Sequence, residues 1–270
     1  MHPAYDYATL TKELNEFRTK HPEIPVFSIG KSVEERNLYA IRLGSGTKRV
    51  FFHGVHHGME WLTAKLPMEF AKDLGDGLYD ADTLWKKSTL YLVPMVNPDG
   101  VEIAKSGKPW QANARGVDLN HNYDALWHRS KLAEVEYGIT EPGPTRYSGA
   151  YPESEPETKA LVNFTRQNSF DLTLAFHSQG EVIYWDFCGT APEESLAYLD
   201  RFEEVSPYLR DAPEGIASYG GYKDWFIQTF KKPGFTIEIG VGKNPLPLED
   251  FPEIYKRTLP LMLEALQFEP

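Results

Sequence analysis

Short apolar runs rich in β-branched and aromatic residues recur along the chain, and polar turns or glycines separate them. The first two runs are joined by the turn KSVEER, and later runs such as RVFFHG, DLTLAFH and FTIEIG are almost continuously apolar. Unbroken runs of this length are typical of strands buried on both faces of a sheet. The pattern therefore predicts strands at residues 26–30, 38–44, 49–54, 88–96, 171–177 and 235–240.

Helical periodicity fills the intervals between these runs. One predicted helix begins at Ser154, three positions before Glu157, which is the spacing of a capping box. Residues 249–268 carry a helical pattern interrupted by prolines, and Pro67 falls inside the helix expected after Glu60, so we expect that helix to bend or begin late. Alternating strands and helices favour an α/β fold with helices on both sides of a sheet.

The remaining segments contain turns rather than repeats. Residues 137–153, YGITEPGPTRYSGAYPE, are rich in turn-forming and aromatic residues, which predicts a surface loop beside a site. With 270 residues and 41% hydrophobic content, the chain is able to bury a substantial core. Because no internal repeat or low-complexity linker is visible in the sequence, we expect residues 1–270 to form one domain.

Charge and composition exclude several classes of protein. The net charge of −11 argues against a nucleic-acid partner, since binding to phosphates depends on clustered Lys and Arg. Cys188 is the only cysteine, which excludes an internal disulfide framework and a multi-cysteine metal cluster. The sequence contains neither an apolar stretch of about 20 residues nor an N-terminal signal pattern. We therefore expect no membrane span, and a cytoplasmic location unless the chain is part of a longer secreted or cell-wall precursor.

Three histidines and a glutamate stand where a predicted strand runs into a helix. His53, His56 and His57 follow the apolar run VFF, at the sheet edge where ligands collect in α/β proteins. His57 and Glu60 are three residues apart, so at the start of a helix their side chains point the same way. An imidazole and a carboxylate are sensible zinc ligands, but an isolated HxxE match is often accidental, and each histidine could simply close a strand.

A third ligand must come from another part of the chain. His177 ends the run DLTLAFH in the same way that His57 follows its own strand. Two histidines and one glutamate would leave a fourth coordination position open for water, which is the pattern of catalytic zinc sites. His57, Glu60 and His177 are therefore the candidate metal ligands.

Two acidic residues lie in unusual surroundings. Glu238 interrupts the apolar run GFTIEIG, and a buried carboxylate must pair with a cation, bind a metal or take part in chemistry. A structural salt bridge is the alternative explanation for Glu238. Asp118 lies in the polar cluster ARGVDLNHNYD and is a candidate acceptor for the second ring N–H of a metal-bound histidine.

Taken together, these segments resemble a known family. HGVHHGMEW, VNPDG, ARGVDLNHNYD, LAFHSQG, GGYKDW and FTIEIG occur in the order found in the zinc carboxypeptidases, the funnelin group. The resemblance extends from the segment IGKS to the C-terminal helix, nearly the whole chain. It implies a mixed, twisted sheet of the eight-stranded type with helices on both faces. Within the family the chain most resembles the bacterial γ-D-glutamyl-L-diamino acid endopeptidases, most clearly in EIGVGKNPLPLEDFPEIY.

The resemblance implies roles for particular side chains. It implies that His57, Glu60 and His177 bind one Zn²⁺ per chain. Glu238 would be the general base that takes a proton from water and passes it to the leaving amine. Arg115 is the candidate electrophile that polarises the scissile carbonyl.

The resemblance also shows two departures in the substrate-binding residues. Asn120 matches the asparagine that helps hold the substrate's terminal carboxylate, but His121 stands where the family usually has an arginine. An imidazole does not replace a bidentate guanidinium equivalently. The tyrosine that closes over the substrate has no firm counterpart, because Ile216 falls at the aligned position and Tyr219 and Tyr222 lie nearby. Both departures favour the cell-wall branch over a digestive carboxypeptidase.

The expected reaction is hydrolysis of the amide between the γ-carboxyl of D-glutamate and a diamino acid, meso-diaminopimelate or L-lysine. The partner would be a peptidoglycan stem peptide or muropeptide fragment, and no obligate protein partner is evident. His121, Lys223 and Lys243 are candidates to read the second charged centre of the diamino acid, although exposed lysines are usually only solvated. Two alternatives remain open: a metallocarboxypeptidase acting on ordinary peptides, and a stem-peptide-binding module without catalysis.

Overall fold

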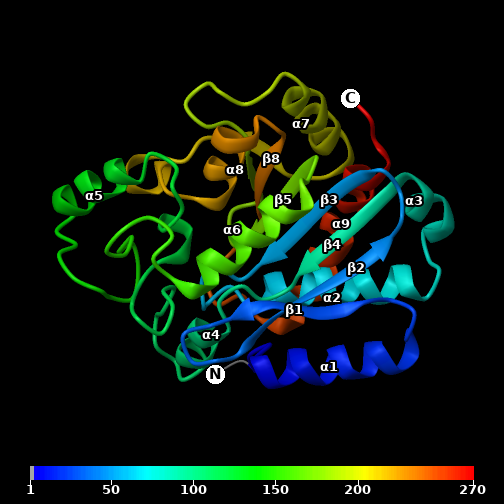
Figure 1. Ribbon diagram of the computed structural model, residues 1–270, viewed down its shortest axis with the longest axis horizontal. Coiled ribbons are helices and arrows are strands. Elements are labelled where there is room, and N and C mark those ends of the chain that lie inside the picture. Colours follow the sequence, from blue (N-terminus) through cyan, green and yellow to red (C-terminus); the bar gives the residue numbers. More distant parts are fainter. Residues whose placement is uncertain (1–2) are drawn as a thin grey trace.

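The computed structural model describes residues 3–270 and contains one mixed sheet with helices on both of its faces (Figure 1). The strands are β1 (Val26–Lys31), β2 (Asn37–Gly44), β3 (Lys48–Gly54), β4 (Ser88–Val93), β5 (Leu172–His177), β6 (Val182–Tyr184), β7 (Leu209–Asp211) and β8 (Gly234–Glu238). The α-helices are α1 (Tyr7–Lys20), α2 (Leu62–Gly75), α3 (Ala81–Lys87), α4 (Pro98–Ala104), α5 (Trp127–Glu136), α6 (Pro156–Asn168), α7 (Glu194–Val205), α8 (Tyr222–Phe230) and α9 (Phe251–Gln267). Short 3₁₀ turns lie at Leu119–His121, Gly215–Ser218 and Leu248–Asp250.

The sheet has eight strands in the order β1-β2-β4-β3-β5-β8-β6-β7. Its centre, β4-β3-β5-β8, is parallel, while β1, β2 and β6 are attached through antiparallel pairings. The expected mixed α/β sheet is therefore confirmed, and every strand predicted from the apolar runs is present. The short strands β6 and β7 were not predicted, because three residues are too few to show alternation.

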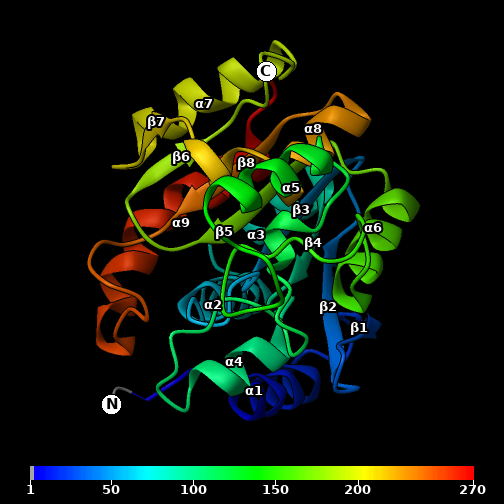
Figure 2. The same ribbon diagram turned by 90° about the vertical axis from the view of Figure 1, so that its left-hand side faces the viewer.

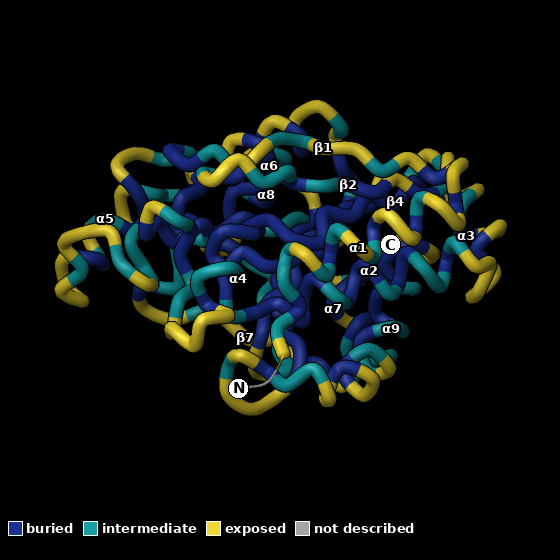
Figure 3. The backbone as a smooth tube through the Cα atoms, turned by 90° about the horizontal axis from the view of Figure 1, so that it is seen from below, coloured by how far each residue is buried: buried dark blue, intermediate teal, exposed yellow. Residues whose placement is uncertain are grey.

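Both faces of the sheet are covered, which explains the continuous apolar runs. Helices α6 and α8 pack on one face, whereas α2, α7 and α9 lie on the other (Figures 2 and 3). Neighbouring side chains of a strand point to opposite faces, so Phe51 joins the core beneath α6 and α8 while Phe52 joins the core beneath α2 and α9. Each residue of β5 is buried. Two hydrophobic layers therefore fix the positions of the strand ends.

Two local predictions concern the starts of helices. Helix α2 begins at Leu62, two residues after Glu60, and continues through Pro67, so the proline does not delay its start. The predicted capping box is wrong, because the N-cap of α6 is Glu155 rather than Ser154. Pro156 occupies the first helical position, and the Glu157 carboxylate accepts a hydrogen bond from the backbone N–H of Val33 (2.9 Å). That distant partner replaces the local reciprocal bond.

Among residues 3–270, no helix is both long and apolar enough to cross a membrane.

Candidate active site

The register of the parallel strands brings the candidate residues together. His177 and Glu238 end adjacent strands β5 and β8 and lie directly opposite each other. His57 and Glu60 belong to the segment that connects the end of β3 to α2, and β3 is the other neighbour of β5. All four side chains therefore lie at the carboxyl edge of the parallel strands, as the sequence pattern predicts.

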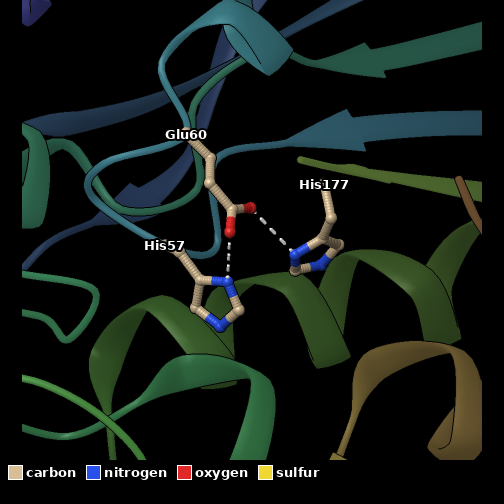
Figure 4. Close-up of side chains that lie close together, drawn as sticks. All are labelled: His57, Glu60 and His177. Atoms are coloured by element: carbon tan, nitrogen blue, oxygen red, sulfur yellow. Dashed lines mark hydrogen bonds and ion pairs between the residues drawn. The ribbon is translucent and has the colours of Figure 1, made fainter. Parts of the chain in front are cut away.

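Glu60 lies between two imidazoles (Figure 4). Its Oε1 is 2.8 Å from His57 Nδ1, and its Oε2 is 3.0 Å from His177 Nδ1. One ligand atom from each residue lies within 4.8 Å of the other two. Two ring nitrogens and a carboxylate at this separation form a donor set that suits a divalent cation such as zinc.

Electrostatics hold the three groups in this arrangement. Burial alone would raise the pKa of Glu60, but the charges of His57 and His177 outweigh it and lower the pKa to about 2. Burial likewise disfavours the charged form of His57, but Glu60 and Asp118 raise its pKa well above the ordinary value. The buried Glu60 carboxylate is therefore stabilised by positive charge, and a bound cation would supply such charge.

Asp118 fixes the orientation of His57. Its Oδ1 lies 3.1 Å from His57 Nε2, and the carboxylate is fully buried. The same carboxylate accepts hydrogen bonds from the backbone N–H groups of Asn120 (3.2 Å) and Arg146 (2.8 Å). With Nε2–H donated to Asp118, the Nδ1 of His57 faces Glu60, and loss of the Nδ1 proton would free a lone pair for a cation. This is the outer contact that the sequence analysis assigned to Asp118.

The other two histidines of the run lie in the core. His53 is fully buried against the ring of Tyr222, with ring centroids 4.2 Å apart, and burial lowers its pKa well below the ordinary value. His56 Nε2 lies 2.9 Å from the Tyr123 hydroxyl, and burial lowers its pKa in the same way. Both are therefore neutral packing residues, whereas His57 enters the site.

A cavity of about 290 Å³ opens beside the three candidate ligands. Its walls include Glu238, Asn120, His121 and Arg146. Burial and the charge of Glu60 raise the pKa of Glu238 to about 8. A carboxylate with a pKa near neutrality and an open face toward a cavity is suited to both accept and release a proton. The volume lies near the lower end for small-molecule sites, which span ~300–1,000 Å³.

Arg115 does not lie where the sequence analysis expected it. Its side chain is 56% exposed, and its guanidinium lies 3.6 Å from the Glu155 carboxylate rather than in the wall of the cavity. Its backbone N–H donates a hydrogen bond to Asn113 Oδ1 (2.9 Å). The placement does not support the role of electrophile.

Arg146 occupies the cavity wall instead, and sequence reasoning missed it. It belongs to the loop of residues 137–153, has a φ of +68°, and its guanidinium donates a hydrogen bond to His121 Nε2 (3.2 Å). Burial lowers the pKa of His121 to about 4, so the imidazole is a neutral acceptor. The guanidinium that is missing at position 121 thus arrives from another segment. The only signal in the sequence was an arginine in a loop predicted to lie beside a site.

A family model described as zinc carboxypeptidase matches residues 10–260.

The chain belongs to the zinc carboxypeptidase family.

Its relatives include gamma-D-glutamyl-L-diamino acid endopeptidase 1 of Lysinibacillus sphaericus, which is 36% identical over 291 residues, covering 97% of this chain and 72% of the relative. The fold of the chain matches bovine thrombin-activatable fibrinolysis inhibitor with a TM-score of 0.81 at 20% identity, covering 98% and 96% of the two chains. It also matches murein-tripeptide amidase MpaA of Escherichia coli O157 with a TM-score of 0.59 at 22% identity, covering 94% and 97%. At these identities the structural matches support the fold alone.

Two tyrosines of this chain have different positions from those expected. Tyr222 is fully buried, and its hydroxyl lies 2.9 Å from Thr165 Oγ1, so the expectation that it binds substrate is wrong. Its aromatic ring is held in the core beneath α8. Tyr219 is partly buried under the guanidinium of Arg129, 5.7 Å from the ring centroid, and does not line the cavity of the described chain.

Asn120 does line the cavity. Its Oδ1 accepts a hydrogen bond from the backbone N–H of Tyr222 (3.1 Å), which ties the residue to the first turn of α8. With the oxygen used in this way, the amide N–H₂ is the group left to donate to a substrate. The family is zinc-dependent, and the His57, Glu60 and His177 cluster is able to hold a metal.

Proposed function

We propose that the chain is a zinc peptidase that hydrolyses the amide bond between the γ-carboxyl of D-glutamate and a diamino acid in peptidoglycan stem peptides. The observation that carries this proposal is the 36% identity, over 97% of the chain, to a relative named for that cleavage. A structural neighbour named as a murein-tripeptide amidase agrees with it. The substrate would be a stem peptide or muropeptide fragment, and residues 1–270 would act as one catalytic domain.

His57, Glu60 and His177 would hold one zinc ion per chain. When bound, zinc polarises a substrate carbonyl and lowers the pKa of a coordinated water toward neutrality. The support for this assignment is the approach of two Nδ1 atoms to the two oxygens of one buried carboxylate, together with Asp118 behind His57.

Glu238 would transfer the proton in this mechanism. It lies opposite His177 in the sheet register and faces the cavity, so it is placed to take a proton from the attacking water. It would then deliver that proton to the amine that leaves when the amide bond breaks. A nearby cation favours the carboxylate form and would lower the pKa from the metal-free value of about 8. The residue would thus enter the reaction as a base.

Arg146 would supply the positive charge that Arg115 was expected to provide. Its guanidinium lies in the cavity wall, held by the neutral His121, and its charge acts to lower the pKa of Glu238. There it would stabilise the negative charge that develops on the carbonyl oxygen during attack. Asn120 would orient the substrate through its side-chain N–H₂ group.

The proposal is tested by parallel assays with zinc-loaded protein on two substrates. One is a γ-D-glutamyl-diaminopimelate peptide, and the other is an ordinary L-peptide with a free C-terminus. We expect the γ-D-glutamyl peptide to give the higher kcat/KM. Faster release of a C-terminal residue from the L-peptide would favour the metallocarboxypeptidase alternative. Tight binding of the stem peptide without turnover, in a protein that holds no stoichiometric zinc, would favour the binding module.

A further inference from the structure

A second cavity, of about 660 Å³, adjoins the reaction cavity, the one that contains Glu238. Its walls come from Met59 and Trp61 on either side of Glu60, from the end of α4 and the segment after it, and from the segment after β8. Asn244 lines both cavities. The two cavities therefore share a wall residue and meet close to the candidate metal ligands.

The shared wall is held in place by hydrogen bonds. Asn244 Oδ1 accepts a hydrogen bond from the Ser178 hydroxyl (2.8 Å), and Asn244 Nδ2 donates one to the Ser178 carbonyl (2.7 Å). The backbone N–H of Ser178 in turn donates to Glu60 Oε2 (3.3 Å). A ligand that extends from one cavity into the other would therefore meet a preformed boundary, which is typical of binding sites.

The second cavity combines an apolar wall with an unused buried donor. Met59, Trp61 and Leu246 contribute apolar surface, as do Pro109, Pro245 and Pro247. Trp61 is only 3% exposed, and its indole N–H has no acceptor among residues 3–270. Core packing accounts for the buried ring but not for the unpaired N–H, since a buried donor without a partner costs free energy. An oxygen atom of a bound ligand would satisfy it.

Positive charge also gathers at this cavity. Of its three lysines, Lys105 is already paired with two carboxylates. Lys108 and Lys243 are exposed, and within the described part of the chain their ammonium groups have no ion pair or hydrogen bond. Exposed lysines are usually only solvated, but these two line one cavity of a chain whose net charge is −11. They are therefore available to an anionic group.

The reaction cavity is too small to enclose the whole proposed substrate. Its volume of about 290 Å³ is at the lower end for small-molecule sites, whereas the substrate includes a stem peptide that is attached to an amino sugar. On the acyl side, a γ-linked D-glutamate leaves its α-carboxylate free, and L-alanine and the sugar follow. This sequence of groups, an anion and then a ring with apolar faces and hydrogen-bonding oxygens, matches the lysines and the apolar wall of the second cavity.

We propose that the second cavity binds the acyl side of the substrate, with Lys108 and Lys243 binding the free α-carboxylate of D-glutamate and the wall around Trp61 contacting the amino sugar. The indole N–H of Trp61 donates to an oxygen of that sugar. This inference rests on the proposed function and deepens it, because it names a glycopeptide rather than a sugar-free peptide as the preferred substrate.

The first test compares two substrates that differ only in the sugar, N-acetylmuramyl-L-Ala-γ-D-Glu-meso-diaminopimelate and N-acetyl-L-Ala-γ-D-Glu-meso-diaminopimelate. For the zinc-loaded wild type we expect kcat/KM to be about tenfold higher for the glycopeptide, the effect of one or two additional hydrogen bonds. The difference should lie chiefly in KM, because the sugar is remote from the bond that breaks. Equal values of kcat/KM for the two substrates would overturn the proposal.

Trp61→Phe tests the wall of the second cavity. The variant keeps an aromatic ring but removes the N–H, so it should reduce the preference for the glycopeptide several-fold. Its zinc content, measured in parallel, separates this effect from damage to the neighbouring Glu60. A zinc-loaded Trp61→Phe that keeps the full preference would show that the indole does not contact the sugar.

A double variant tests the two unpaired lysines. Lys108→Met combined with Lys243→Met should raise KM for both substrates, because both carry the α-carboxylate. The matched control is Lys12→Met combined with Lys256→Met, which changes the net charge equally at exposed positions of α1 and α9. We expect the control to change KM less than about twofold. Equal effects of the two double variants would reduce the contribution of the lysines to long-range attraction and reject their assignment.

A binding measurement separates this inference from the proposed function. Calorimetry uses N-acetylmuramyl-L-Ala-D-Glu and N-acetyl-L-Ala-D-Glu, which lack the amide bond to a diamino acid. Tighter binding of the glycopeptide to the wild type, with a smaller difference in Trp61→Phe, supports the site even if γ-D-glutamyl peptides are not cleaved. Equal affinity for the two ligands, in a protein that does cleave those peptides, rejects the site and leaves the proposed function intact.

Discussion

The guanidinium of Arg146 donates a hydrogen bond to Nε2 of His121 over 3.2 Å, and this contact links a surface loop to the turn that carries Asn120. The family resemblance implies an arginine at the position of His121, and in this structure Arg146 places a guanidinium in the cavity from a different part of the chain. The neutral imidazole accepts the bond and holds Arg146 in the cavity wall. The cavity therefore contains a guanidinium next to position 121 although residue 121 itself is a histidine.

Arg146 is predicted to be essential for turnover. Replacing it with methionine should lower kcat by about 10²–10³-fold, the usual effect of removing one donor to a developing oxyanion, with a smaller change in KM. Steady-state kinetics on the γ-D-glutamyl peptide provides the measurement. Arg115→Met is the matched control and should change kcat less than about twofold, because surface substitutions usually have small effects. The opposite order of effects would return the role to Arg115.

Asp118 is predicted to strengthen metal binding without touching the metal. Asp118→Asn replaces the charged acceptor behind His57 and should weaken zinc affinity by about 10–100-fold. Competition with a fluorescent chelator measures this affinity directly. Asp124→Asn, at an exposed position near by, should leave it unchanged. Equal zinc affinity in the wild type and Asp118→Asn would show that His57 needs no such support.

Zinc is predicted to stabilise the fold through Glu60. At a free zinc concentration 100 times its Kd, binding should add about 2.7 kcal/mol to the free energy of unfolding. Chelator should remove both this stabilisation and the activity, and added zinc should restore them. Glu60→Gln should abolish the zinc-dependent shift in Tm, whereas Glu69→Gln, on the partly exposed side of α2, should retain it. A zinc response that survives in Glu60→Gln would contradict the ligand assignment.

The stability of the metal-free protein is predicted to fall with rising pH through Glu238. Its pKa in the fold is about 8 against an ordinary value of 4.5, because it is buried and faces Glu60. The folded state therefore holds this proton more tightly than the unfolded chain, so the associated stability is present below pH 4.5 and lost as the pH rises through 8. In the presence of chelator, the Tm of Glu238→Gln should exceed that of the wild type by a margin that grows as the pH rises from 5 to 9. Parallel melting curves would contradict the raised pKa.

The sequence was sufficient for the parts of the fold that depend on long apolar runs. Each central strand is buried on both faces, so its hydrophobic signal is strong, and the ends of β3, β5 and β8 place His57, His177 and Glu238 at one edge. The three-residue strands β6 and β7 give no such signal. The short motif of a capping box was also misleading, because a tertiary contact to Val33 decides where Glu157 points.

Residues around the reaction centre were harder to predict for the same reason. The metal-binding cluster follows from strand ends and from the three-residue spacing of His57 and Glu60, which here falls in a turn before α2 and not in the helix. Arg146 reaches the cavity through a loop whose path depends on Asp118 and His121, and no local pattern records those contacts. Tyr222 lies beside a glycine pair in the sequence, yet the packing of α8 on the sheet turns its ring into the core. Tertiary packing thus decided the positions that spacing alone left open.

The residues that line the cavity come from strand ends, from a loop and from the start of a helix. The candidate metal ligands and Glu238 lie at strand ends and in the segment after β3, whereas Arg146 lies in a loop and Lys223 in the first turn of α8. Exchanging the first turn of α8 should therefore reshape one wall of the cavity while Arg146, Glu238 and the candidate metal ligands stay in place. Because the wall of the cavity and the candidate reacting groups lie on separate elements, the fold is a suitable starting point for engineered amidases.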